Sequence, residues 1–187
     1  MKKNQDIVYN DCWIFILLLT TLVILTESMK VYTFNIFEID LTYALFLLPF
    51  SYFIVNYIAK KYDYKKAIAA IAISGVIFVS FTCIISYLVS NNLMLDSIAG
   101  ELCAYVVSQF INLTIYMFLL NNTPSLFVLV LFNYLFALVV YYMIYTLLYL
   151  NMVVGDTYWI GYFITLIIQF ILCIIITIID KKIKRGQ

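Results

Sequence analysis

The chain has 187 residues, of which 66% are hydrophobic and 11% charged, and its net charge is +1 at neutral pH. Soluble domains average roughly 45–50% apolar residues, so this composition excludes a water-soluble globule and indicates an integral membrane protein. The small net charge gives no basic surface for nucleic acid. The sequence has no histidine, which also excludes Ser-His-Asp and Cys-His catalysis and most zinc sites.

Six apolar segments follow one another, and each has about the ~20 residues needed to cross a bilayer. They lie at residues 12–29, 41–59, 67–90, 97–120, 125–150 and 158–179. Lys2 and Lys3 precede the first segment as in a signal peptide, but no small-x-small cleavage site follows, so a retained span is expected. The connections are short, so residues 1–187 are predicted to form one all-α, polytopic domain of six transmembrane helices. Pro49 lies inside the second segment and predicts a kink there.

The basic residues are distributed unevenly between the two sides of the predicted membrane domain. With six spans, both termini lie on the same side as the second-to-third and fourth-to-fifth connections. That side collects ten of the eleven basic residues, namely Lys2, Lys3, Lys60, Lys61, Lys65, Lys66, Lys181, Lys182, Lys184 and Arg185. The positive-inside rule therefore predicts that both termini are cytoplasmic. Because Ile, Tyr, Asn and Lys are abundant, as in the products of AT-rich bacterial genomes, we expect a multi-pass protein of the bacterial inner membrane.

The fourth segment carries a polar stripe. Glu101, Tyr105, Ser108 and Asn112 are spaced at i, i+4, i+7 and i+11, which places them on one face of a helix, with Gln109 beside that face. Asn112 lies ~16 Å below Glu101 at ~1.5 Å per residue, so the stripe reaches from the outer surface to about mid-membrane. Such a stripe is costly unless it faces other helices, water or a ligand. We expect it to form one wall of a small-molecule site.

Two further segments place polar side chains at similar depth. The sixth repeats the spacing of the fourth with Tyr158, Tyr162, Thr165 and Gln169, and the fifth places Asn133 near the middle of the membrane. Aromatic residues are plentiful nearby: Phe110, Tyr134, Phe136, Tyr141 and Trp159. Amides combined with aromatic faces suit a flat, uncharged heterocycle held by edge hydrogen bonds and stacking.

Each of these features also has a purely structural interpretation. Amide side chains in spans bond neighbouring helices, typically for about 0.6–2 kcal/mol. Glu101 can simply lie in the headgroup layer, and Tyr158, Trp159 and Tyr162 can form an interfacial aromatic belt. The lysines of residues 60–66 are topology signals or a docking patch. Small residues on the third segment predict close helix packing or a face for a partner protein; they are Ala67, Ala70, Ser74 and Gly75.

Two stretches resemble a known family. LLPFSYFIVNYIAKKYDYKKA at residues 47–67 resembles its pattern of a proline pair, a Thr-Asp, a Tyr-Gly and basic residues, and AYVVSQFIN at residues 104–112 resembles its Ala-Tyr…Gln-x-x-Asp segment. The family is the YhhQ-like queuosine-precursor transporters, also called the vitamin uptake transporter family. The chain is similar to it from about residue 26 to residue 184 in span number, spacing and loop length. Three family aspartates fall on other residues here, namely on Asn56, on Asn112 and near Phe136, and a family glutamate falls on Lys60.

The resemblance implies a six-helix bacterial membrane protein similar to the substrate-binding subunits of energy-coupling-factor importers. Members of the family take up 7-deazapurines such as 7-cyano-7-deazaguanine or queuine. The leading hypothesis is thus an importer of a small flat solute, with no enzymatic activity and no cofactor. Gln109 and Asn112 would bind the polar edge of the solute, and Asn133, Thr165 and Gln169 would complete the ring.

Two questions stay open at the level of sequence. The importer either works alone or binds a shared energy-coupling-factor module, because no ATP-binding motif is present in the sequence. The alternative to an importer is a non-transporting membrane scaffold or accessory subunit, in which the amides only join helices. An enzyme is disfavoured because no paired acids and no nucleophile with a base are apparent.

Overall fold

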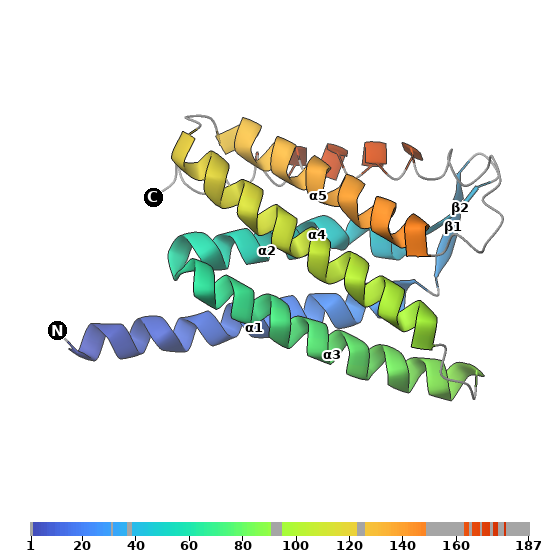
Figure 1. Cartoon of the computed structure of the whole chain (residues 1–187), viewed down its shortest axis with the longest axis horizontal. Coiled ribbons are helices and arrows are strands. Elements are labelled where there is room, and N and C mark those ends of the chain that lie inside the picture. Colours follow the sequence, from blue (N-terminus) through green and yellow to red (C-terminus); the bar gives the residue numbers. More distant parts are fainter. Residues whose placement is uncertain are drawn as a thin grey trace.

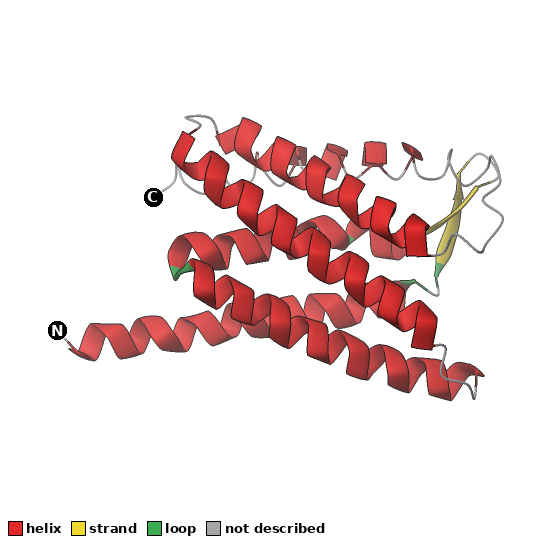
Figure 2. Cartoon of the chain, in the orientation of Figure 1, coloured by secondary structure: helices red, strands yellow, loops and turns green. Residues whose placement is uncertain are grey.

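The computed structural model describes residues 2–30, 32–36, 39–90, 95–122 and 126–148, together with separate helical positions between 163 and 178. In order, its elements are α1 (Lys2–Met29), β1 (Thr33–Ile36), β2 (Ile39–Thr42), the 3-10 turn η1 (Tyr43–Phe46), α2 (Leu48–Lys61), α3 (Tyr64–Ser90), α4 (Leu95–Asn122) and α5 (Leu126–Leu148). The helices run roughly along the long axis of the molecule, with the two strands at one end (Figure 1). Helix makes up nearly all of the described chain (Figure 2).

Helix α2 lies at the centre of the bundle. It contacts α1, α3 and α4, while α4 packs along α5 and α3 packs along α1. Of the span that contains α2, 61% is buried inside the protein, compared with 28% to 39% of the other three candidate spans. A helix enclosed by protein on most sides can carry polar side chains that a lipid-facing helix could not.

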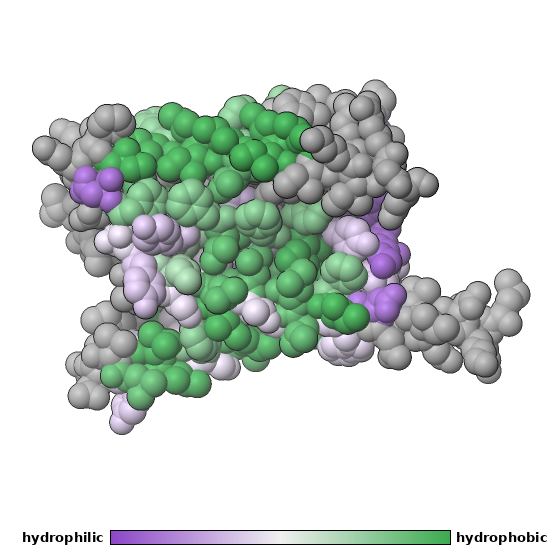
Figure 3. All heavy atoms as spheres, turned by 180° about the vertical axis from the view of Figure 1, so that it is seen from behind, coloured by the Kyte–Doolittle hydropathy of each residue, from purple (hydrophilic) through white to green (hydrophobic). Residues whose placement is uncertain are grey.

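Four helices are long and apolar enough to cross a membrane, judged by length and composition. They cover Asp11–Met29, Tyr43–Lys61, Tyr64–Leu88 and Ile98–Leu120, and a shorter apolar helix covers Phe132–Ile144. One face of the molecule is hydrophobic across its middle, and its most hydrophilic residues lie toward the two ends (Figure 3). The chain is therefore a mostly helical membrane protein. The count of six spans stays a prediction, because most of residues 158–179 lies outside the described residues.

The second predicted span, residues 41–59, differs from the observed structure at its start. Its first residues belong to β2, which pairs antiparallel with β1 in the register Thr33 to Thr42. Helix α2 begins only at Leu48, after η1. A two-stranded ribbon is marginal by itself, but the Phe34 ring packs 4.9 Å from the Tyr43 ring, measured between centroids. The all-α prediction therefore missed a short hairpin, and we call the end of the bundle that carries it the hairpin end.

The predicted kink at Pro49 is wrong. Pro49 stands in the first turn of α2, where its missing N–H would have no helical partner in any case. Proline thus starts this helix instead of bending it. The opposite end of α2 turns directly into α3 through Tyr62 and Asp63, and this end carries Lys60, Lys61 and Lys65. We call it the lysine end.

The small residues of α3 pack against neighbouring helices. Ala67, Ala70 and Ser74 are fully buried, and the first two join a core with residues of α1, α2 and α4. The backbone of α3 can approach so closely because these side chains are short. The close-packing interpretation of these residues is confirmed for the helices of this chain.

Enlarging one of these residues should therefore destabilise the bundle. We expect Ala70→Leu to lower the free energy of unfolding by about 1–3 kcal/mol, because a leucine overpacks a filled site. Gly75→Ala is the matched control: its added Cβ would lie 3.6 Å from Leu102 Cδ1 and from Val106 Cγ2, which is ordinary contact. Thermal unfolding of the purified protein in detergent measures both, and an unchanged melting temperature for Ala70→Leu would contradict the packing described here.

Candidate functional site

A cluster of polar side chains lies buried between α2, α4 and α5. Ser108, Gln109 and Asn112 of α4 and Asn133 of α5 are fully buried, and Asn56 of α2 is 3% exposed. The stripe on α4 therefore faces the inside of the bundle and not its surface. We call these residues, together with Ser51 and Tyr52 of α2, the amide cluster.

Asn112 is the residue that joins the three helices. Its Oδ1 accepts hydrogen bonds from Asn56 Nδ2 at 3.2 Å and from Asn133 Nδ2 at 2.7 Å. Its own Nδ2 donates back to Asn56 Oδ1 at 3.0 Å and to the Tyr52 carbonyl oxygen at 3.5 Å. The hydrogen-bonding capacity of the Asn112 amide is thus used largely within the protein.

A second set of bonds lies about one turn nearer the hairpin end. Gln109 Nε2 donates to Ser51 Oγ at 2.8 Å, and Ser51 Oγ donates to the Leu48 carbonyl oxygen at 2.7 Å. The Tyr52 hydroxyl donates to Ser108 Oγ at 3.0 Å. Helices α2 and α4 are therefore bonded side chain to side chain over successive turns.

Two buried oxygens of the cluster lack a hydrogen bond from the part of the chain that the structure describes. Gln109 Oε1 and Asn133 Oδ1 have no partner among the residues that the structure describes. Leaving a buried polar group unsatisfied costs about 1–3 kcal/mol, and the hydrocarbon core offers no water in compensation. Both oxygens can therefore gain energy from a donor that enters the cluster.

Tyr105 lies outside the amide cluster and joins α4 to α3. Its hydroxyl is hydrogen-bonded to Ser74 Oγ at 2.8 Å, and its ring stacks on Phe78 with centroids 5.9 Å apart and planes 8° apart. Both the hydroxyl group and the ring of Tyr105 therefore contact α3. The position that the sequence assigns to the wall of a solute site is occupied by a helix-to-helix contact.

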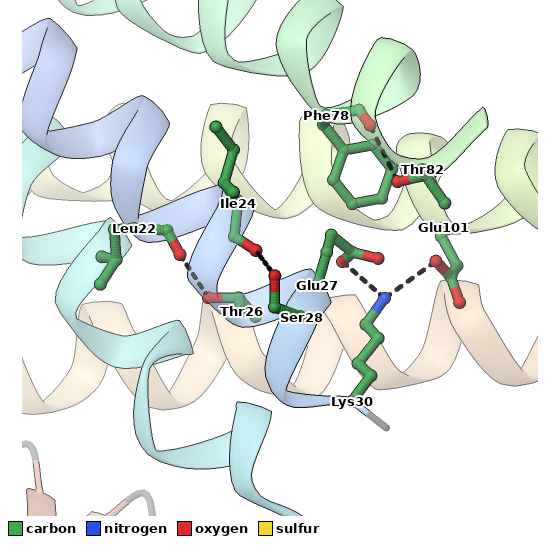
Figure 4. Close-up of polar contacts among 9 residues, drawn as sticks. All are labelled: Leu22, Ile24, Thr26, Glu27, Ser28, Lys30, Phe78, Thr82 and Glu101. Carbon is green, nitrogen blue, oxygen red and sulfur yellow. Dashed lines mark hydrogen bonds and ion pairs between the residues drawn. The ribbon is translucent and has the colours of Figure 1, made fainter. Parts of the chain in front are cut away.

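Glu101 forms an ion pair at the hairpin end. Lys30 Nζ lies 2.7 Å from Glu27 Oε1 and 2.8 Å from Glu101 Oε2 (Figure 4), and it also lies 5.6 Å from the centroid of the Phe78 ring. We call Glu27, Lys30 and Glu101 the ion triad. Burial lowers the pKa of the Lys30 ammonium, but Tyr141 and the two carboxylates raise it above the ordinary lysine value. Lys30 is therefore charged, and it links the end of α1 to α4.

The aromatic residues expected around the cluster divide into two groups. Phe110 and Phe136 are 37% and 55% exposed, so they face outward. Tyr134 is buried, and its ring centroid lies 6.2 Å from that of Tyr52. The aromatic faces at the cluster come from this pair, of which Tyr134 was expected from the sequence and Tyr52 was not.

Helix α2 supplies Ser51, Tyr52 and Asn56 to the cluster, and no binding role for these residues was expected from the sequence. One signal was available: the span that contains α2 has the lowest mean hydropathy of the four, at 1.3, as expected for a helix enclosed by protein. The predicted site residues Thr165 and Gln169 lie outside the described residues, as do Tyr158, Trp159 and Tyr162.

Comparison with known proteins adds no assignment, because no family model, no curated protein and no solved structure matches this chain. The kind of ligand that the site could bind is therefore inferred from the positions and hydrogen bonds of its side chains.

Removing the central amide should loosen three helices at once. We expect Asn112→Leu to lower the free energy of unfolding by about 1–3 kcal/mol, because Asn56 and Asn133 lose their shared acceptor. Thr114→Val is the control, since Thr114 is exposed and bonds only within its own helix, to the Phe110 carbonyl oxygen. Unfolding in increasing denaturing detergent measures the difference, and equal stability of the two variants would contradict the joining role of Asn112.

Removing the ammonium of the ion triad should leave two carboxylates without a counter-charge. The side chains of Lys30, Glu27 and Glu101 are 27%, 9% and 13% exposed, so some screening by water remains. We expect Lys30→Gln to cost about 1–3 kcal/mol, less than for a fully buried pair. Adding Glu27→Gln and Glu101→Gln should restore most of the loss. Thermal unfolding of the single and triple variants checks this, and a triple variant weaker than the single one would contradict it.

Proposed function

We propose that the chain is a bacterial inner-membrane uptake transporter for a small flat solute, most simply a queuosine precursor of the 7-deazapurine class or a vitamin-like compound. The observation that carries the proposal is the pair of buried amide oxygens, Gln109 Oε1 and Asn133 Oδ1, that no described residue satisfies. A membrane protein gains nothing structural from such groups, whereas a solute with N–H donors would satisfy both.

The depth of the cluster supports a solute site. Asn112 lies eleven residues from Glu101 along α4, or ~16 Å at ~1.5 Å per residue, and ten residues from the end of α4 at Asn122. Substrate sites of membrane transporters lie near the midplane, between packed helices. The amide cluster has this depth and is enclosed by three helices.

One contact between α2 and α4 bears on the resemblance to the queuosine-precursor transporters. Asn56 and Asn112 stand where the family has acidic residues, and here their two amides bond each other in both directions, at 3.2 Å and 3.0 Å. Two carboxylates at this distance could not both be ionised. Amides at both positions make the cluster neutral, which favours an uncharged solute over a cation.

The free groups also define which edge of the solute is bound. The groups of the cluster that have no partner among the described residues are the two amide oxygens, Gln109 Oε1 and Asn133 Oδ1, and both are acceptors. A solute edge with two N–H donors, as in an aminopyrimidinone ring, matches them. The rings of Tyr52 and Tyr134 border the same cluster and offer apolar faces to a flat ring.

A second candidate function is favoured by the bonds that the cluster does make. A scaffold or accessory subunit would use Asn56, Asn112 and Asn133 only to hold α2, α4 and α5 together. It would bind no small solute saturably. The two functions therefore differ in a binding measurement and not in the fold.

The proposal leaves two possible energy sources for uptake. An importer of this kind either moves its solute down a gradient alone or binds an energy-coupling-factor module on the cytoplasmic side, where both termini are predicted to lie. Co-purification of the chain with an ATPase from its own cells separates these two modes.

Removing the free acceptors should impair solute uptake. Cells that express the chain should accumulate labelled 7-deazapurine, and Gln109→Met or Asn133→Leu should each weaken apparent affinity by up to about tenfold, the equivalent of one neutral hydrogen bond. Asn122→Leu is the control, because this amide is exposed and, within the described residues, donates to the Phe118 carbonyl oxygen of its own helix. Unchanged uptake in a Gln109→Met, Asn133→Leu double variant would refute the site, and absence of saturable binding to any purine, deazapurine or B-vitamin would favour the scaffold.

A further inference from the structure

A cluster of lysines surrounds the turn between α2 and α3. Lys60, Lys61 and Lys65 are exposed and Lys66 is partly buried, and Asp63 is the acidic residue among them. Hydrophilic residues gather toward this end of the face shown in Figure 3. The turn therefore presents a net positive surface, which we call the lysine patch.

One lysine of the patch is held in place by aromatic rings. Lys61 Nζ lies 5.3 Å from the ring centroid of Phe15 on α1, 5.7 Å from that of Tyr57 and 5.1 Å from that of Tyr62. Cations are attracted to ring faces at these distances. The ammonium is thus positioned by two helices while its side chain stays exposed, so it can still bind an anion.

Aromatic residues also indicate the depth of the patch in a membrane. Tyr57, Tyr62 and Tyr64 lie at this end, and Trp13 of α1, beside the buried Cys12, is 62% exposed. The Cys12 side chain belongs to the same core cluster as Ala59 and Ala67, which flank the turn. Tyrosine and tryptophan are enriched where hydrocarbon meets headgroups. The lysine ammonium groups accordingly lie at the level of lipid phosphates.

We propose that the lysine patch binds the headgroup of an anionic phospholipid, with Lys61 as the central contact and Lys60 and Lys65 flanking it. Basic clusters next to a membrane span attract anionic lipid. On α1, Ile14 and Leu18 next to Phe15 are 62% and 50% exposed, so apolar surface for acyl chains continues from the aromatic rings. This combination of phosphate-binding and acyl-binding surface favours a lipid over an acidic protein.

The test uses the full chain purified in neutral detergent. Phosphatidylglycerol should raise the melting temperature by about 2–4 °C more than phosphatidylcholine does, and native mass spectrometry should show it retained. Lys60→Gln, Lys61→Gln and Lys65→Gln together should abolish the preference. The matched variant with arginine at the same three positions should keep it, because the charge is retained.

A further variant tests the aromatic rings separately from charge. Phe15→Leu keeps every lysine and should reduce the preference for phosphatidylglycerol without removing it, because Lys61 loses one of its three rings. If the triple glutamine variant does not fold, Lys65→Gln alone should give a partial loss.

Three results would overturn the proposal. They are equal shifts with phosphatidylglycerol and phosphatidylcholine, an equal shift with inorganic phosphate alone, and polyglutamate binding that anionic lipid does not displace. The last result would make the patch a docking surface for an acidic protein. None of these outcomes bears on solute uptake, so the lipid site can fail while the importer stands.

Discussion

The fold depends on the absence of water around its polar core. Within the bilayer an amide that leaves one partner has to find another in the protein, since no solvent molecule can replace it. Asn112 meets this constraint by bonding both Asn56 and Asn133, from α2 and α5. These bonds fix the rotation of three helices, because a turn of any one of them would leave a donor or an acceptor in hydrocarbon.

The same constraint bears on the proposed solute site, because it identifies the groups of the cluster that the described residues leave without a partner. The side-chain nitrogens of Gln109 and Asn133 each donate to a protein acceptor, whereas the side-chain oxygens of both residues have no partner among the described residues. A solute with N–H donors would add bonds without breaking any.

The sequence predicted the positions of the helices along the chain better than it predicted which side chains of different helices contact each other. Spacing of polar residues on the fourth segment identified the face with Ser108 and Asn112, because helical periodicity is a property of the local chain. It did not separate Tyr105, which bonds Ser74 of α3, from the residues that meet α2. Ser51, Tyr52 and Asn56 were given no binding role because they form no long stripe on a short helix, and only packing shows that they face α4.

Two predictions for the second segment were also wrong, namely the start of its helix and the kink at Pro49. Residues 41–46 are as apolar as a span, so composition alone merged the end of β2 and all of η1 with α2 and placed Pro49 in the interior of a helix and not in its first turn. The hairpin pairs Thr33–Ile36 with Ile39–Thr42, and the alternation of polar and apolar residues in both stretches is a strand signal that a search for long apolar segments does not register.

The two ends of the bundle carry different arrangements of charged side chains. At the hairpin end, two carboxylates and one ammonium meet in the ion triad, and at the lysine end three exposed ammonium groups surround one turn. Lys30 is the basic residue that the predicted topology leaves on the outer side, and its ion pairs hold it between α1 and α4. A lysine against the predicted positive-inside bias is tolerated there because the two carboxylates neutralise its charge within the protein, whereas the side chains of Lys60, Lys61 and Lys65 at the opposite end are exposed.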